Sequence, residues 1–371
     1  MRPVVVLSAV PAGWCTPTQR EKGRTMTTMP DEITGGVDTH LDVHVAAALN
    51  AIGGLLGVES FPADGPGYRR LLEWLQSFGT VVLIGVEGTG SYGAGLTRHL
   101  HDKGMRVVEV DRPNRQERRR AGKSDPLDAV EAARAALSGR AKSLAKTRNG
   151  SVESIRVLRV ARSSARKDRV RALNQLRSLI STAPEELRAD LRGLSIFRLV
   201  AKAAALRPND RTDVGNATKV ALRSLARRVR SIDAEMAEID AVLAPLVAAT
   251  APDLMTLSGL GTDTAGSLIV AAGDNPERLR NEATFAHLCG VSPLDASSGK
   301  QLRHRLNRGG DRQANSALWR IVVTRMASDP RTQRYVERRC KEGLTKTEAM
   351  RCLKRYVARE VFYYLVPLNA A

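Results

Sequence analysis

The order of short apolar runs between residues 33 and 110 constrains the fold most strongly. Three such runs come first, beginning at Gly35, Val43 and Gly54, and they predict a meander of three strands with glycine or asparagine at the turns. Helical and strand patterns then alternate over residues 68–78, 81–86, 92–103 and 106–110. This order predicts an α/β domain with a mixed sheet covered by helices.

Acidic residues stand at the ends of two predicted strands and at the start of a later helix. Asp38 ends the first apolar run, and Glu87 ends the run of the predicted central strand. Asp125 and Asp128 open a helix, with Asp125 expected as its N-cap and Pro126 at the first helical position. An ionised carboxylate in such a place is costly unless a cation compensates it. Because converging oxygen ligands suit Mg²⁺, and paired metals cut and rejoin phosphodiesters, the four acids predict metal-dependent chemistry on nucleic acid.

Each acid also has an ordinary structural explanation when it is taken alone. Asp38 fits a turn between strands, Glu87 fits the start of a glycine-rich turn, and Asp128 fits a favourable charge at a helix N-terminus. The predicted metal site therefore depends on the four acids occurring together.

The net charge of +19 indicates a polyanionic partner. Nucleic acid is favoured over an anionic membrane, because no long amphipathic stretch sets basic residues opposite bulky aromatics. A basic run between Arg112 and Lys123 lies just before Asp125, which favours a phosphate-binding segment over a solvated charge run. The residues of this run predicted to bind nucleic acid are Arg115, Arg118, Arg119, Arg120 and Lys123.

The four cysteines argue against a disulfide framework and against a zinc site. They are scattered, without paired spacing, which favours the reducing cytoplasm. No apolar run is long enough to span a bilayer, so no membrane partner is expected. Residues 1–32 are expected to form a disordered N-terminal extension, with Met26 or Met29 as the true initiator; a weak signal peptide is the less favoured interpretation.

Residues 146–250 are predicted to form a helical coiled-coil region. Apolar residues recur three and four apart in its second half, as in the a/d seam of a coiled coil. They are Leu222, Leu225, Val229, Ile232, Met236, Ile239, Leu243 and Leu246. A break is expected near residues 208–213, and Pro245 is expected to end or kink the helix. An antiparallel hairpin within one chain and a coil that forms a dimer both fit the seam.

Residues 251–371 are predicted to form a mainly α-helical C-terminal domain. The segment Gly259-Leu260-Gly261 before an apolar helix resembles a helix-hairpin-helix turn, whose backbone N–H groups face phosphate. A plain turn between two helices fits the segment equally well.

A Ser-Ser-Gly-Lys loop is the second candidate for chemistry. Ser298 stands directly before a glycine, so its hydroxyl is expected to be accessible, although most such loops are only flexible and polar. His304 is a candidate general base, and Asp311 is expected to cap the following helix. Cationic residues around the loop would neutralise a phosphate and stabilise its transition state. They are Lys300, Arg303, Arg305, Arg308 and Arg312.

In combination, these motifs resemble the DEDD transposases of bacterial insertion sequences, the group called IS-one-ten, which is related to the Piv-type DNA invertases. The likeness extends from about Gly35 to Tyr364. It rests on Gly-Val-Asp-Thr, Val-Glu-Gly-Thr-Gly, Lys-Ser-Asp-x-x-Asp-Ala, the coiled-coil middle, Gly-Leu-Gly, and Ser-Gly with Arg-Gly-Gly-Asp. The resemblance implies a RuvC-like, RNase H-like domain over residues 33–145. It also implies a catalytic Mg²⁺ or Mn²⁺ site made of Asp38, Glu87, Asp125 and Asp128.

The resemblance further implies a recombinase that moves its own element. Ser298, or Ser297 if the loop register is off by one, would be the nucleophile and would form a covalent phosphoserine–DNA intermediate. The implied partners are donor and target DNA, a structured guide RNA from the element, and further copies of the chain in a dimer that becomes a tetramer on DNA. The implied location is the bacterial cytoplasm, at the nucleoid.

Three other functions share part of the pattern. A site-specific invertase of the same family would carry the same motifs and differ in the DNA around its gene. A metal-dependent Holliday-junction or RNase H-like nuclease would need the four acids but not Ser298. A decayed transposase would bind nucleic acid without cutting it.

Overall fold

The computed structural model describes residues 31–110, 124–209, 212–275, 279–298 and 304–365. The predicted extension, residues 1–32, falls outside these ranges except for Asp31 and Glu32, and Glu32 already begins the first strand. The basic residues of the 112–123 run, Lys300 and Arg303 also fall outside them.

A five-stranded mixed sheet forms the N-terminal part of the chain, as predicted. Its strands are β1 (Glu32–Thr39), β2 (Val43–Leu49), β3 (Leu55–Pro62), β4 (Thr80–Glu87) and β5 (Val107–Val110). They lie in the order β3-β2-β1-β4-β5, in which the first three form an antiparallel meander and β4 and β5 run parallel to β1. This is the RNase H-like α/β arrangement.

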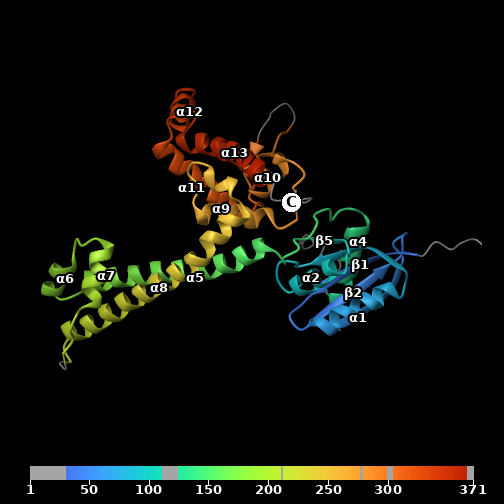
Figure 1. Ribbon diagram of the computed structural model, residues 1–371, viewed down its shortest axis with the longest axis horizontal. Coiled ribbons are helices and arrows are strands. Elements are labelled where there is room, and N and C mark those ends of the chain that lie inside the picture. Colours follow the sequence, from blue (N-terminus) through green and yellow to red (C-terminus); the bar gives the residue numbers. More distant parts are fainter. Residues whose placement is uncertain (1–30, 111–123, 210–211, 276–278, 299–303, 366–371) are drawn as a thin grey trace, which may run out of the picture.

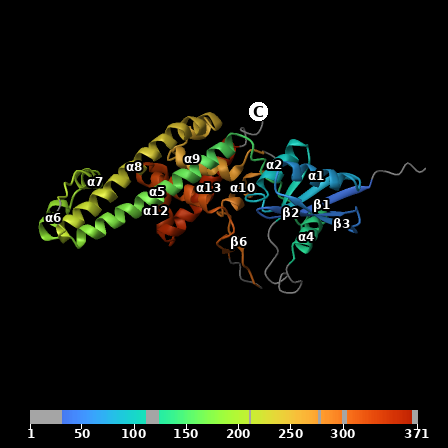
Figure 2. The ribbon, with the colours of Figure 1, turned by 90° about the horizontal axis from the view of Figure 1, so that it is seen from below.

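Helices cover both faces of the sheet. Helices α1 (Gly65–Gln76) and α2 (Ala94–Asp102) lie on one face, and α4 (Asp125–Leu137) lies on the other (Figures 1 and 2). The apolar stripe of α1 drives its packing, since Leu71 and Leu75 are fully buried against the sheet.

Helix α4 lies unusually close to the backbone of β1. A Cβ atom added to Gly36 would lie 2.1 Å from the amide nitrogen of Ala133 and 2.3 Å from the carbonyl oxygen of Ala129. A Cβ atom added to Gly85 of β4 would lie 2.7 Å from the carbonyl oxygen of Ala132. Glycine in the strands and alanine on the helix therefore allow direct contact between the two backbones.

Two long helices form an antiparallel hairpin within the chain, which is the first of the two arrangements that the seam allowed. They are α5 (Ser151–Ser181) and α8 (Val214–Thr250), and the short helices α6 (Glu185–Leu191) and α7 (Ile196–Ala204) cover their far end (Figure 1). The seam residues Leu222, Val229 and Leu243 are fully buried.

Pro245 does not end the helix, since α8 continues through this proline to Thr250, and a kink at this position remains a prediction. The proline ring faces outward, and the end of the helix packs in the core of the C-terminal region beside Val152 and Ile155 of α5. Tertiary packing of Leu243 and Val247 in this core compensates for the backbone hydrogen bond that a proline removes.

The C-terminal region is mainly helical. Its elements are η1 (Asp253–Thr256), α9 (Thr262–Ala272), α10 (Glu282–Leu288), the hairpin β6 (Leu294–Asp295) and β7 (His304–Arg305), α11 (Arg312–Ser328), α12 (Pro330–Lys341) and α13 (Lys346–Leu365). Asp311 caps α11 as predicted, accepting hydrogen bonds from the N–H groups of Gln313 and Ala314. Among the helices in the described ranges, none has the length and apolar character needed to cross a membrane.

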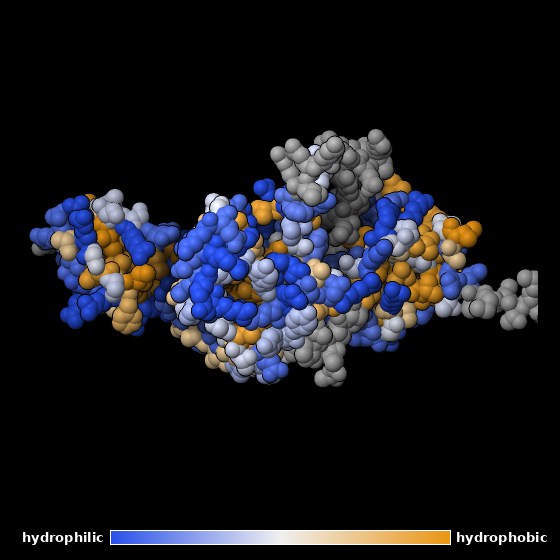
Figure 3. All heavy atoms as spheres, turned by 90° about the horizontal axis from the view of Figure 1, so that it is seen from above, coloured by the Kyte–Doolittle hydropathy of each residue, from blue (hydrophilic) through white to orange (hydrophobic). Residues whose placement is uncertain are grey.

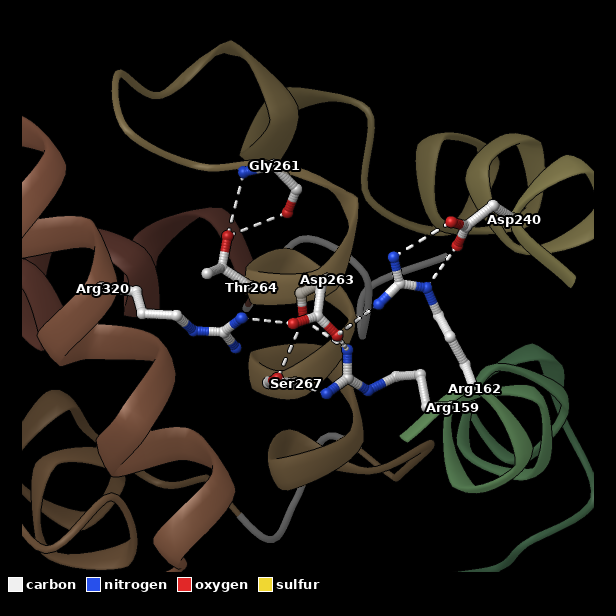
Figure 4. Close-up of polar contacts among 8 residues, drawn as sticks. All are labelled: Arg159, Arg162, Asp240, Gly261, Asp263, Thr264, Ser267 and Arg320. Atoms are coloured by element: carbon white, nitrogen blue, oxygen red, sulfur yellow. Dashed lines mark hydrogen bonds and ion pairs between the residues drawn. The ribbon is translucent and has the colours of Figure 1, made fainter. Parts of the chain in front are cut away.

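A charged network joins the hairpin to the C-terminal helices (Figure 4). Asp263, in the first turn of α9, pairs with Arg159 of α5 at 2.6 Å and with Arg320 of α11. Arg162 of α5 lies 4.0 Å from Asp263 and 2.5 Å from Asp240 of α8. One carboxylate therefore links three helices that are far apart in the sequence.

Replacing Gly36 with alanine should destabilise the protein by about 3 kcal/mol, because the new methyl group would displace the backbone of α4. Urea unfolding followed by circular dichroism would measure this change. Gly65→Ala is the matched control, since a Cβ atom there meets nothing within 4 Å. A Gly36→Ala protein as stable as the control would contradict the close contact.

Replacing Asp263 with alanine should cost about 2 kcal/mol, because it leaves Arg159, whose side chain is only 12% exposed, without its carboxylate partner. The exposed pair of Asp168 with Arg171 offers a control, and Asp168→Ala should cost under about 0.5 kcal/mol. Burial alone would raise the pKa of Asp263, but hydrogen bonds and charge from Arg320 and Arg159 outweigh burial and lower that pKa below 3.8. The stability difference should therefore persist above pH 3.8 and disappear as the pH falls through the lowered pKa. Thermal unfolding across this range would test both expectations.

Candidate metal centre

The carboxyl ends of β1 and β4 bring two predicted acids to one edge of the sheet. In the parallel register Val37 lies beside Val86, so Asp38 and Glu87 are the next residues along the two strands. Side chains alternate between faces along a strand, and Gly36 and Gly85 face α4. Asp38 and Glu87 therefore lie on the face of the sheet that α4 covers.

Helix α4 carries the other two acids to the same place. It crosses β1 with Ala129 and Ala133 against Gly36, and its N-terminus reaches the end of the strand. The expected cap was wrong by one position: Ser124 is the N-cap, and Asp125 is the first helical residue. Asp125 and Asp128 both remain in the first turn, where carboxylates are favoured by the helix dipole.

Three side chains meet at this helix end and form a candidate metal centre. Ligand atoms of Asp38, His40 and Asp125 all lie within 4.8 Å of one another. The Nε2 atom of His40 lies 3.1 Å from Oδ2 of Asp38 and 3.4 Å from Oδ1 of Asp125. The side chain of Asp38 is 9% exposed, whereas those of His40 and Asp125 are 41% and 49% exposed, so the cluster opens to solvent on one side.

The electrostatics of the cluster favour a bound cation. Burial raises the pKa of Asp38, the charge and hydrogen bond of His40 lower it, and the charges of Asp128 and Asp125 raise it further. Desolvation and two neighbouring negative charges thus both destabilise the ionised form of Asp38. A divalent ion would relieve both costs, and one imidazole with several carboxylates is a donor set that binds Mn²⁺ well and leaves room for the oxygen ligands of Mg²⁺. The residues present therefore fit the metal that the acids predicted.

The four predicted acids are not equally close. Asp38 and Asp125 belong to the cluster, and Asp128 is near enough for its charge to act on Asp38. Glu87 is buried at the end of the neighbouring strand, and within the described residues the group of mutually close ligand atoms does not include it.

The turn after Glu87 is fixed against the end of β1. The Thr39 hydroxyl donates to the carbonyl oxygen of Glu87 at 2.8 Å, and the Thr89 hydroxyl donates to Glu109 at 2.8 Å. Gly88 has φ of +69°, and a Cβ atom there would lie 3.0 Å from the Thr39 hydroxyl oxygen. Each acid is therefore followed by a residue that the contact between the two strand ends requires. Thr39 donates the hydrogen bond that joins them, and Gly88 adopts the positive φ of the turn beside Thr39.

His40 is a site residue that the sequence did not single out. The signal was present, because residues two apart at a strand end share a face, and Asp38-Thr39-His40 places an imidazole beside a carboxylate.

The serine loop lies elsewhere, in the C-terminal region. Ser298 is exposed and follows the short strand β6, and no histidine, cysteine or acidic residue of the C-terminal region belongs to the cluster found among the described residues. Ser297 is engaged locally: its hydroxyl lies 2.5 Å and its N–H 2.9 Å from Oδ1 of Asp295. Asp295, which pairs with His304 across the β6–β7 hairpin, was also missed by the sequence, although it stands two residues before Ser297.

Of the predicted cationic residues, three are described. Arg305 lies in β7 and is exposed, and Arg308 and Arg312 line a hollow below the hairpin. Neither the 112–123 run nor Lys300 and Arg303 has a described position, so their roles remain predictions.

An RNase H-like sheet with an acidic centre at its strand ends, followed by a helical hairpin and a helical domain, defines the class of DEDD transposases. A family model described as "Transposase", of the DEDD type, matches residues 35–183, and one described as "Transposase IS116/IS110/IS902 family" matches residues 251–337. The chain belongs to the IS110 family of transposases.

One similar protein is the "Insertion element IS110 uncharacterized 43.6 kDa protein" of Streptomyces coelicolor. The two are 32% identical over 106 residues, which cover 28% of this chain and 26% of that protein. The matched part of this chain therefore spans about a quarter of that relative's length.

Mn²⁺ should raise the melting temperature of the protein, since a ligand at about a hundred times its dissociation constant stabilises the folded state by about 2.7 kcal/mol. Asp38→Asn and Asp125→Asn should each remove this gain, and Asp102→Asn, an exposed residue at the end of α2, should retain it. Isothermal titration of Mn²⁺ into His40→Ala would then show whether His40 is a ligand, in which case the affinity falls about tenfold or more. Equal Mn²⁺ stabilisation of wild type and Asp38→Asn would contradict the centre.

Proposed function

We propose that this protein is a transposase that cuts and rejoins DNA strands to mobilise its own insertion sequence. The observation that carries the proposal is the convergence of Asp38, His40 and Asp125 within 4.8 Å at the strand ends of an RNase H-like sheet. Family membership supports it, as does a net charge of +19.

The proposed division of labour follows the chain. Residues 33–145 would form the domain that holds the metal, residues 146–250 the helical arm, and residues 251–371 the domain that supplies the serine. Asp38, Glu87, Asp125 and Asp128 would hold Mg²⁺ or Mn²⁺, with His40 beside them. The ion would supply positive charge to the scissile phosphate and its oxygens.

Ser298 is the proposed nucleophile. Its hydroxyl oxygen would form a bond to the phosphorus while the bond to the leaving DNA oxygen breaks, and the serine proton would end on that leaving oxygen or on water. The resulting phosphoserine ester conserves the phosphodiester bond, so attack by a DNA hydroxyl can rejoin the strands and regenerate Ser298 without an outside energy source. The exposure of Ser298 supports this role, whereas the contact of Ser297 with Asp295 supports a structural role for Ser297.

The active assembly is proposed to contain more than one copy. Ser298 belongs to the C-terminal region and the acidic cluster to the N-terminal sheet, and the serine of one copy would complete the acidic centre of another when dimers pair into a tetramer on DNA. This arrangement would prevent cleavage until donor and target DNA have gathered the copies.

A structured RNA from the element is the proposed guide. Base pairing of the RNA with donor and target DNA would supply sequence specificity, while the protein would hold backbone and shape. The aromatic content of 4% supports this division, because base-stacking side chains for direct readout are few.

The competing functions differ in what they need. A nuclease of the Holliday-junction or RNase H-like type would use the acids with water as the nucleophile and leave no protein on the DNA. An invertase of the same family would use both sites but flip a fixed segment, which the sequence flanking the gene would reveal.

Ser298→Ala should abolish strand exchange, with a loss of at least about 10³-fold, because no other group would form the covalent intermediate. The assay is mobilisation of a plasmid-borne copy of the gene with its flanking DNA, followed by a denaturing gel that detects protein attached to cleaved strands. Ser297→Ala is the matched control and should retain both activities. Full strand transfer by Ser298→Ala, with loss in Asp125→Asn, would favour the nuclease instead.

A further inference from the structure

A cationic hollow of about 500 Å³ lies at the base of the β6–β7 hairpin. Gly290, which precedes β6, and Leu306, which follows β7, both line it, together with side chains from α11 and α13. The hollow therefore opens where the β6–β7 hairpin, the segment that contains Ser298, joins the C-terminal helices.

The charge of this hollow is one-sided. Arg308, Arg312, Arg351 and Lys354 line it, and its lining includes no carboxylate from the described residues. A larger hollow between α11, α12 and α13 differs, because its arginines share it with Asp329 and Glu360. Four cations around an opening without acidic partners repel one another, and an anion in the opening would stabilise them.

Lys354 is held in place rather than left to solvent. Its ammonium donates to Oδ1 of Asn315 at 2.8 Å, and the Nδ2 group of Asn315 donates to the carbonyl oxygen of Cys289 at 2.8 Å. Burial lowers the pKa of Lys354, and the charge of Arg351 lowers it further. Asn315 and the carbonyl group of Cys289 thus fix the position of the Lys354 ammonium in the absence of a ligand.

Trp319 adds an aromatic surface to the same opening. Its side chain remains 48% exposed although it is the largest apolar side chain of α11. It follows Arg312 by seven residues and Ser316 by three, so the three side chains share one face of the helix. An exposed indole beside guanidinium groups matches a nucleotide, since the base can stack on the ring while the phosphate meets the cations.

We propose that this hollow binds an unpaired nucleotide of single-stranded nucleic acid, with its phosphate on Arg351 and Lys354 and its base on Trp319. The inference rests on the proposed function and deepens it, because a strand held here would continue along the hairpin toward Ser298. Arg351 and Lys354 lie beyond residue 337, where the matched family model ends. Figure 3 shows that hydrophilic side chains gather over the C-terminal helices on the face that it draws.

The test is fluorescence anisotropy with a labelled twenty-base oligonucleotide, as single-stranded DNA, as single-stranded RNA and as duplex DNA, in EDTA so that the acidic centre takes no part. Arg351→Gln with Lys354→Gln should weaken single-strand binding about tenfold or more and reduce the slope of affinity against salt by about one to two. Trp319→Ala should weaken single-strand binding about tenfold and leave duplex binding unchanged, and Trp319→Phe should recover most of the loss. Arg69→Gln with Arg70→Gln is the control for net charge, since these exposed arginines lie on α1, across the sheet from α4.

The outcomes separate the two proposals. Equal binding by the α13 double variant and the α1 double variant, or equal loss of single-strand and duplex binding in Trp319→Ala, would overturn the hollow as a nucleotide site. Mobilisation of the element by the wild-type protein tests the proposed function independently of single-strand binding. Weaker binding of DNA and RNA alike supports a site that holds phosphate and base, and a loss confined to one of them identifies the strand it takes.

Discussion

The contact between α4 and β1 is the constraint on which the candidate metal centre depends. Because Gly36 has no side chain, the helix backbone rests directly on the strand, with Ala129 and Ala133 against it. This contact fixes both the distance of α4 from the sheet and the direction in which the helix crosses β1. The first turn of α4 therefore lies at the end of β1. The proximity of Asp125 to Asp38 is therefore a consequence of backbone packing. It cannot come from attraction between the two side chains, because two carboxylates repel each other.

The same geometry explains why the pKa of Asp38 is raised. Asp38 is nearly buried and faces like charges from α4, and His40 is the cationic or hydrogen-bonding group that partly compensates them. A stable fold tolerates such a site because the surrounding contacts, including the hydrogen bond from Thr39 to Glu87, hold the strand ends regardless of what occupies the centre.

The N-terminal fold could be predicted because each strand is a short apolar run between clear turns. The metal site could be predicted only because four acids, each with an ordinary explanation of its own, occur together in this pattern. The sequence could not predict that the apolar seam of α8 packs against α5, because apolar residues spaced three and four apart show only that a helix has an apolar face. The position of α4 relative to the sheet depended on Gly36 and Gly85, which a sequence presents as ordinary strand glycines. His40 was missed because a histidine after a strand is common in turns. Trp319, Arg351 and Lys354 were missed because they come together only when α11 packs beside α13. The division of the chain into residues 33–145, 146–250 and 251–371 remains a prediction, although the core that Val152 and Leu243 share with α9 and α11 joins the base of the hairpin to the last of these parts.

The length of the α5–α8 hairpin means that a small tilt at its packed end moves its far end a long way. Helix α8 has 37 residues, which corresponds to about 55 Å at 1.5 Å per residue. A tilt of only about 5° at its root would sweep the α6–α7 tip through about 5 Å, whereas the same tilt barely disturbs the packed end. The ion pairs of Asp263 with Arg159 and Arg320, and of Arg162 with Asp240, join α5 and α8 to the C-terminal helices at the packed end. A small rearrangement of these few ion pairs would therefore move the α6–α7 tip, and anything bound to it, by several ångströms.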